Sequence, residues 1–278
     1  MTKLASPGWL CKLCRIPDAL RRSHLLAAAF YKIVTRQENG WADHPVKYDS
    51  VSETALYSND QLQQHLLCDA CEDRLKKYGE DTVTRQCWRA GDKFRLKALL
   101  QSVDPHRTPE GDTYWDDSVI GGQINIDSYR YFALSVLWRA SVVRWPGATA
   151  NYNGALGQKY SEQFRNYLIH GEPFPKNVII SIFVEFDSAP LIFMTSPQSI
   201  PASFDSYNFR SHSFVVPGLM FQIFVGRDAE RWRENARLDI PKSCVFYPIA
   251  FRESEFVRSF GIRAKGADLK GKLRREWQ

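Results

Sequence analysis

Cys11-Lys-Leu-Cys14 and Cys68-Asp-Ala-Cys71 decide the fold of the first part of this chain. Each C-x₂-C pair places two thiolates on one tight turn, with a spacing that suits two corners of a zinc tetrahedron. The four cysteines predict a site with no open coordination position, so the expected zinc is structural. Such a metal takes the place of a hydrophobic core in a unit too small and polar to fold alone.

The second cysteine pair is predicted to open a short helix over Cys71–Tyr78. Its acidic residues come first, its basic residues come last and Gly79 follows, an order that favours a helix with its end at the glycine. A knuckle that opens directly into a helix is typical of a treble-clef zinc unit, which we assign to residues 1–84. Within this unit, Leu25–Val34 is expected to pass from strand to helix, and Gln37–Tyr57 to be a polar insertion.

Residues 85–174 are predicted to form a helical region. Apolar residues recur at spacings of three and four over Ile126–Trp145, the pattern of a helix with a buried face. A second, shorter helix is expected over Lys159–Ile169, ended by Gly171. In the first of these helices, Trp138-Arg139 is predicted to contribute a core side chain and an ion pair.

Residues 175–278 are predicted to form an antiparallel β-rich region with a basic C-terminal tail. Short runs rich in β-branched and aromatic residues alternate there with turn formers, and Pro217-Gly218 indicates a hairpin between two of them. The expected strands are Val178–Phe186, Leu191–Thr195, Ser213–Val216, Leu219–Val225 and Cys244–Phe251. The predicted fold class is therefore α+β, with an N-terminal treble-clef zinc unit, central helices and a C-terminal antiparallel sheet.

Composition and charge disfavour a membrane protein or a secreted protein. The chain has 278 residues, 44% of them hydrophobic and 24% charged, as in an ordinary soluble protein. No apolar run approaches the ~20 residues of a membrane helix, and no apolar signal segment opens the chain. A cytoplasmic location without membrane contact is therefore expected. In that reducing compartment paired cysteines indicate metal rather than disulfides, and the isolated Cys87 and Cys244 are expected to be buried.

The net charge of +6 is compatible with a polyanionic partner. Basic residues gather between the first cysteine pair and His24, where Arg21 and Arg22 are candidates to contact phosphates. A second basic cluster ends the chain. An equally simple interpretation is solvated surface charge followed by a frayed tail.

The sequence also resembles the HNH endonuclease superfamily in its zinc-stapled form, and a group of uncharacterised bacterial HNH-like proteins. The matching stretches are Cys11–Cys14, Ser23-His24-Leu25-Leu26 and Leu66–Glu72, so the resemblance covers roughly the first 80 residues. Three positions differ from the family pattern, and one of them is Glu72, which stands where members often carry His or Asn. Ser23 stands where members carry Asp or His, and Gln63 stands near the place of a family Asn.

The resemblance implies a metal-dependent nuclease that hydrolyses phosphodiester bonds, with DNA favoured over RNA as substrate. His24 would be the general base, since a neutral imidazole accepts a proton near neutral pH. Glu72 would help to hold a catalytic Mg²⁺ or Mn²⁺, which steadies charge on the leaving oxygen. A role in phage defence would fit such a protein, with recognition or homo-oligomerisation supplied by the C-terminal part.

The residues leave a second interpretation open: a non-catalytic zinc-stabilised module that binds nucleic acid or a protein partner. In that case His24 is a packed histidine and Glu72 a carboxylate that interacts favourably with the first turn of its helix. A separate activity in the C-terminal sheet is disfavoured, because that region has no glycine-rich phosphate loop, nucleophile elbow or paired-histidine motif.

Overall fold

The N-terminal part is built on a two-stranded antiparallel sheet that follows the first cysteine pair. The structure, a computed structural model, describes residues 9–35, 45–89, 93–108, 110–148, 151–188, 190–200, 207–235, 244–255, 257–258 and 266–276. Strand β1 (Leu20–His24) pairs with β4 (Gln63–Cys68), and Cys68 leads directly into α2 (Asp69–Leu75). Helix α1 (Ala28–Thr35) and the hairpin of β2 (Val46–Asp49) and β3 (Thr54–Tyr57) lie between the two strands in sequence.

The helix that opens at the second cysteine pair does not end at Gly79. It continues through a π-helical turn, η1 (Lys76–Glu80), into α3 (Asp81–Gln86), so the prediction of a glycine cap was wrong. A Cβ added at Gly79 would lie 2.9 Å from the backbone nitrogen of Phe132. Glycine is therefore needed here for the close approach of η1 to a central helix.

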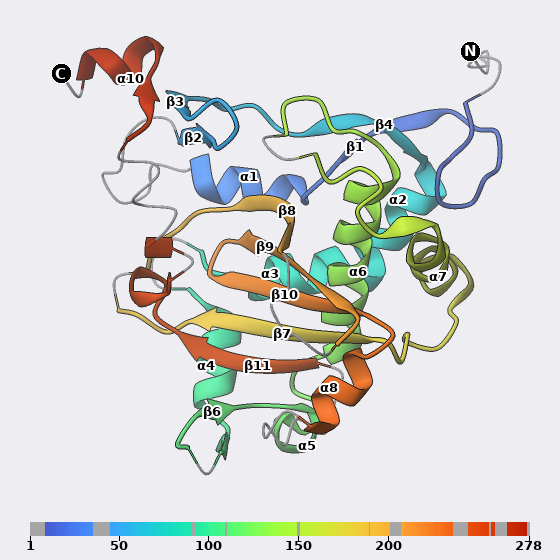
Figure 1. Cartoon of the computed structure of the whole chain (residues 1–278), viewed down its shortest axis with the longest axis vertical. Coiled ribbons are helices and arrows are strands. Elements are labelled where there is room, and N and C mark those ends of the chain that lie inside the picture. The colour runs from blue at the N-terminus through green and yellow to red at the C-terminus, as the bar shows by residue number, and fades with distance from the viewer. Residues whose placement is uncertain are drawn as a thin grey trace.

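The two long central helices predicted from the spacing of apolar residues are confirmed. They are α6 (Ile126–Val142) and α7 (Gly157–His170), and the shorter α4 (Arg95–Gln101) and α5 (Asp117–Ile120) precede them. The side chain of Asn125 accepts a hydrogen bond from the backbone of Ser128 and so caps α6, while α7 ends at Gly171 in the left-handed conformation. Helix α6 is buried on nearly all sides because it lies between the N-terminal part and the C-terminal sheet (Figure 1).

The C-terminal sheet has the strand order β11-β7-β10-β9-β8. Its turn at Pro217-Gly218 joins β9 to β10 as predicted, with Leu219 paired to Val216. The antiparallel prediction was wrong for one pair, since β11 runs parallel to β7. Helix α8 follows β10, and β11 lies beside β7 on the edge away from β10. The bounds are β7 Val178–Glu185, β8 Thr195–Ile200, β9 Phe209–Val216, β10 Leu219–Gly226, α8 Ala229–Asn235 and β11 Cys244–Ile249.

Strand β8 begins where the predicted strand Leu191–Thr195 ends. Residues 191–194 have no regular structure. Pro197 lies inside β8, at a register shift against β9. Proline is tolerated in this position because β8 is an edge strand, where a missing N–H leaves no ladder bond unmade.

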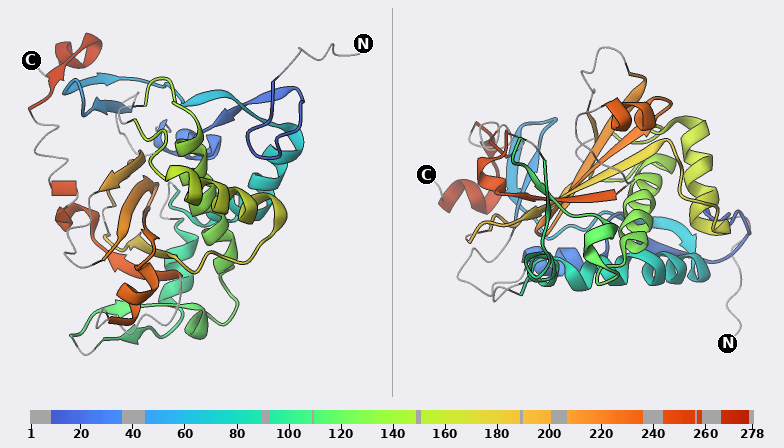
Figure 2. Two further views of the ribbon diagram at one scale, coloured as in Figure 1. Left: turned by 45° about the vertical axis from the view of Figure 1, so that its right-hand side comes forward. Right: turned by 90° about the horizontal axis from the view of Figure 1, so that it is seen from below.

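One continuous hydrophobic core joins the three regions assigned from the sequence. It runs from Leu13 near the first cysteine pair through α6 to Phe246 in the outermost strand. The ring of Phe132 contacts Phe30 of α1 and Phe214 of β9. Alternate residues of β7 and β10 face this core, and the side chains on the opposite face of the sheet pack against α8. The two views of Figure 2 show the ribbon of the sheet with its helices.

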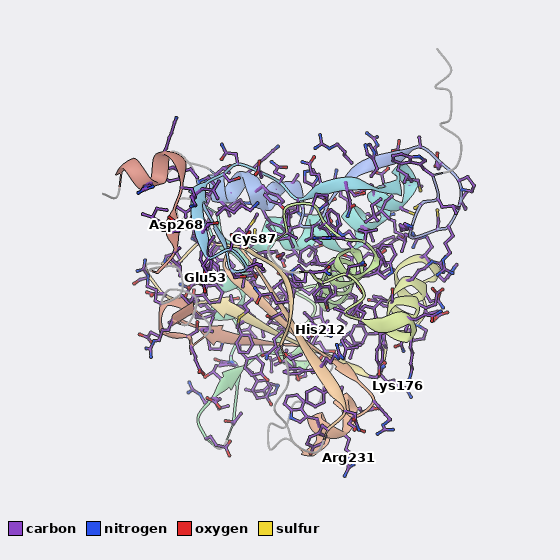
Figure 3. The ribbon with its side chains drawn as sticks, turned by 45° about the horizontal axis from the view of Figure 1, so that its top comes forward. Glu53, Cys87, Lys176, His212, Arg231 and Asp268 are labelled. Carbon is purple, nitrogen blue, oxygen red and sulfur yellow. The ribbon has the colours of Figure 1, made fainter. Side chains whose placement is uncertain are left out.

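The C-terminal segment returns to the N-terminal part. Strand β12 (Asp268–Leu269) pairs in parallel with β3 and is followed by the basic helix α10 (Gly271–Glu276). The backbone N–H of Asp268 donates to the carbonyl of Glu53 at 2.9 Å, and Figure 3 labels both residues at this junction. The remaining short elements are β5 (His106–Arg107), β6 (Thr113–Tyr114) and the 3₁₀ turn η2 (Phe251–Glu253). Among the described residues, no helix is long and apolar enough to cross a bilayer.

Candidate functional site

The four cysteines Cys11, Cys14, Cys68 and Cys71 meet as the sequence predicts. Their sulfur atoms all lie within 4.8 Å of one another, and Cys14 Sγ is 3.8 Å from Cys68 Sγ. A zinc ion with Zn–S bonds of about 2.3 Å would set an S···S separation of about 3.8 Å, so the cluster has the size of a zinc tetrahedron. Within the described parts of the chain, no other group of three or more cysteine, histidine or acidic side chains is arranged to hold a metal ion.

The electrostatics of the cluster also favour a cation. A hydrogen bond from Cys71 lowers the pKa of Cys11 to about 4, and the same contact raises the pKa of the Cys71 thiol. The backbone N–H of Cys68 donates to Cys11 Sγ at 3.4 Å. The ionised form of Cys11 is therefore favoured, while ionisation of the neighbouring Cys71 is disfavoured. A bound metal removes this conflict because its charge stabilises all four thiolates together.

Helix α7 holds the first cysteine turn from outside the N-terminal part. The guanidinium of Arg165 is buried, and its Nε donates to the carbonyl of Leu13 at 2.6 Å. Arg165 also pairs with Glu162 at 2.9 Å, and Glu162 in turn pairs with Arg15 just after the turn. Arg15 has a φ of 62°, in the left-handed region, so the turn adopts a conformation that a neighbouring element helps to fix.

His24 lies at the end of β1 and is neither fully exposed nor fully buried. Its Nε2 is 2.8 Å from Gln61 Oε1 and 2.7 Å from Gln63 Nε2. The ring nitrogen can donate to the first amide or accept from the second, so either tautomer fits. Among the described residues, no carboxylate is hydrogen-bonded to this imidazole. Leu25 and Leu26 are buried, and the centroid of the His24 ring lies 6.1 Å from that of the Tyr31 ring.

Ser23 of β1 and Glu72 of α2 lie next to one another, with a hydrogen bond between them. Ser23 is 1% exposed and its hydroxyl accepts from the backbone N–H of Leu67 at 3.2 Å. Burial raises the pKa of Glu72, against the opposing effects of the Arg139 charge and a hydrogen bond from Ser23. Glu72 Oε1 is buried and has no hydrogen-bond partner among the described residues. The carboxylate is thus close to β1 and incompletely satisfied.

Arg139 of α6 joins this site to the centre of the molecule. Its side chain is 1% exposed, and its terminal NH1 donates to the His24 carbonyl at 2.9 Å. The other terminal nitrogen is 2.7 Å from Glu80 Oε1, yet neither atom is in hydrogen-bond geometry, so this contact is Coulombic. The sequence predicted an ion pair for Trp138-Arg139 and that prediction is confirmed. The contact with His24 was missed, because no local pattern links residues so distant in the chain.

The two arginines proposed as phosphate contacts have different surroundings. Arg21 forms an ion pair with Asp69 at the start of α2, whereas no ion pair is found for Arg22 within the described residues. Both line an open cleft of about 220 Å³ that they share with three acidic residues. These are Asp69, Glu72 and Asp73. The cleft therefore carries cations on its strand side and carboxylates on its helix side.

The remaining histidines lie away from the cleft or have structural partners. His65 stands beside β1 and contacts the carbonyl of Leu20, and His212 is buried in β9 against the hydroxyl of Tyr152 at 2.6 Å (Figure 3). His106 pairs with Asp116, and His44 falls outside the described residues. Cys87 and Cys244 are both buried, as predicted.

Comparison of the chain with protein-family models, with curated proteins and with solved structures finds no match. The functional argument for this protein therefore depends on its own residues and their geometry.

Proposed function

We propose that the N-terminal part is a zinc-stapled, treble-clef nuclease unit of the HNH type, acting on phosphodiester bonds of nucleic acid, with DNA favoured. The observation that carries the proposal is the position of Glu72, which lies against β1, the strand that ends at His24. The two residues are 48 positions apart in sequence, yet Glu72 lies within electrostatic reach of His24 and beside Ser23. The element order around them, with a cysteine turn, β1, β4 and α2, is the order that a treble clef requires.

In the proposed reaction His24 accepts the proton of an attacking water. Gln61, an exposed side chain, gives up its place at the imidazole to that water and the scissile phosphate. Glu72 supplies a carboxylate oxygen to a divalent cation. Its Oε1, which has no hydrogen-bond partner among the described residues, is suited to be that ligand. Arg22 contacts a neighbouring phosphate. The cation, when bound, stabilises charge on the leaving oxygen.

The test is a cleavage assay on labelled single-stranded and duplex DNA and RNA with added Mg²⁺ or Mn²⁺. His24→Ala is expected to slow cleavage by about 10²–10⁴-fold, the usual contribution of a general base. Zinc content is expected to stay at the wild-type level. His170→Ala, at the exposed end of α7, is the matched control and is expected to cleave normally. Equal cleavage by wild type and His24→Ala would contradict the proposal.

A second candidate function is favoured by one observation, the guanidinium of Arg139 beside Glu72. A fixed positive charge at this place competes with a divalent cation for the carboxylate. In this alternative the protein is a non-catalytic, zinc-stabilised module that binds nucleic acid. It predicts binding that needs no Mg²⁺ or Mn²⁺ and no cleavage of any substrate form.

A further inference from the structure

Three large apolar side chains are exposed close to the first cysteine pair. Trp9 is 52% exposed, Leu10 50% and Ile16 61%. Only three other large hydrophobic side chains of the described residues are exposed, and these are spread over the β2–β3 hairpin and η1. Scattered exposed apolar residues are normal, whereas a group of them marks a binding surface.

Trp9 belongs to a row of side chains that leads to His24. Its ring lies edge-on to the ring of His65, with the centroids 5.5 Å apart. His65 Nδ1 contacts the carbonyl of Leu20 at 3.1 Å, and because a carbonyl only accepts, this nitrogen is the donor. The imidazole is thereby held in place, with its Nε2 turned away from this bond.

The register of the strand pair places Arg22 and His24 on the same face as His65. Arg22 is opposite His65, and His24 is opposite Gln63, with no register shift between them. Residues two apart on a strand point to the same side and are separated by roughly 7 Å. The row is therefore Trp9, His65 with Arg22, and then Gln63 with His24, while Ser23 points to the buried side.

The charges along the cysteine turn and β1 are mostly positive, with the carboxylates of Asp69, Glu72 and Asp73 across the cleft from Arg22. Between Trp9 and His24 the sequence has the cations Lys12, Arg15, Arg21 and Arg22 and a single carboxylate, Asp18. Arg15 and Arg21 are paired with acidic side chains, whereas no ion pair of Lys12 or Arg22 is found among the described residues, so these two cations are the candidates to contact a phosphate. An exposed indole next to unpaired cations is the arrangement that binds unpaired bases, since every base has a face that stacks on an aromatic ring.

We propose that this row, named here the Trp9 platform (Trp9, His65 and Arg22), binds single-stranded nucleic acid and leads it across His24. One base stacks on Trp9 and the next phosphates contact Arg22. A duplex does not fit this role, because its bases already stack on one another and hide their faces. The proposal names the substrate class of the site proposed above and so rests on that function, although the binding itself needs no cleavage.

The experiment measures fluorescence anisotropy of a labelled single-stranded oligonucleotide titrated with the full chain, without added Mg²⁺ or Mn²⁺ and at several salt concentrations. Trp9→Ala is expected to weaken binding about tenfold, the low end of the range for loss of one stacked base, and to leave the salt dependence unchanged. Trp9→Phe is expected to retain most of the affinity. The control Val51→Ala changes a residue that is 78% exposed on the β2–β3 turn and is expected to bind as wild type.

Arg22→Gln separates the phosphate contact from the stacking contact. Loss of one phosphate contact is expected to reduce the slope of log affinity against log salt by about 0.7 for a single strand. A duplex of the same sequence is expected to bind more weakly than the single strand and to be insensitive to Trp9→Ala. Binding by Trp9→Ala equal to wild type, or an equal loss for single strand and duplex, would overturn the Trp9 platform.

The two proposals fail in different ways. A protein that needs Trp9 for single-strand binding but cleaves nothing refutes the nuclease and keeps the Trp9 platform. Cleavage that depends on His24 but not on Trp9 refutes the Trp9 platform and supports the nuclease. Wild-type zinc content and unchanged circular dichroism in each variant show that the fold is intact.

Discussion

Glu72 and Arg139 place opposite charges beside the buried face of β1, and the balance between them decides what this site holds. The ion pair of Arg139 is with Glu80, so Glu72 keeps a buried oxygen without a hydrogen bond among the described residues. A carboxylate in that state either binds a cation or lowers the stability of the fold, because burial penalises its charged form. Its response to pH and to metal distinguishes these two roles.

Glu72→Gln is expected to raise the free energy of unfolding at about pH 7 and to have no effect at low pH. Burial raises the pKa of Glu72 in the folded state above the ordinary value of 4.5 for a glutamate. The penalty for the ionised carboxylate is thus absent below that value and grows as the pH rises through the folded-state pKa. Urea denaturation at a series of pH values measures this difference.

Added Mn²⁺ reverses the order if Glu72 holds a cation, because the carboxylate binds the metal and the amide does not. The exposed neighbour Asp73 provides the control, and Asp73→Asn is expected to change the stability little at any pH. Identical stability of wild type and Glu72→Gln across the pH series would contradict a buried charge at this position.

At the scale of the elements, the sequence predicts what periodicity and spacing encode and misses what contacts between elements decide. The spacing of apolar residues found α6 and α7 to within a few residues, and Pro217-Gly218 found the hairpin. The parallel pairing of β11 was missed because it depends on which side of β7 the chain reaches. The end of α2 was misplaced because a glycine at position 79 can be explained in two ways. It can cap a helix, or it can allow a close contact, and from the sequence the cap is the commoner explanation.

Gly79→Ala is expected to destabilise the protein by about 1–3 kcal/mol, as overpacking in a core does. The added Cβ would meet the nitrogen and Cα of Phe132 at 2.9 and 3.0 Å, which are backbone atoms that cannot swing aside. In an unobstructed helix the same change stabilises by roughly 0.5–1 kcal/mol, so the sign of the effect is diagnostic. Chemical denaturation gives the value, and a stabilised variant would refute the contact.

At the scale of the whole molecule, buried arginines connect the N-terminal part to the helices. Arg139 donates to the carbonyl of His24 across 115 positions in sequence, and Arg165 to that of Leu13 across 152. The cysteine ligands could be predicted from their spacing alone. These arginines could not, because an arginine in a helix gives no local signal of a distant carbonyl. The sequence therefore predicts the four cysteines of the candidate site, but not the arginines that support it.

Arg165→Met is expected to weaken zinc binding about 10–100-fold, the usual effect of losing a group that orients a ligand. The cysteine turn loses the hydrogen bond that holds the Leu13 carbonyl, while the four sulfurs remain. Competition with a chromophoric chelator measures the affinity. Lys159→Met removes an exposed cation from the same helix and is expected to bind zinc as wild type does. Equal affinity of wild type and Arg165→Met would show that α7 does not support the cysteine turn.

The distance in sequence between the cysteine cluster and Arg165 also sets an order of events during synthesis. All four thiols have left the ribosome once residue 71 is clear of it, whereas Arg165 follows roughly 90 residues later, after about 5–20 s of translation. The four thiols are therefore available to a metal before the support that fixes the first cysteine turn has been synthesised. Expression under zinc limitation is expected to lower the yield of folded protein, because the cysteine turn then forms without its metal.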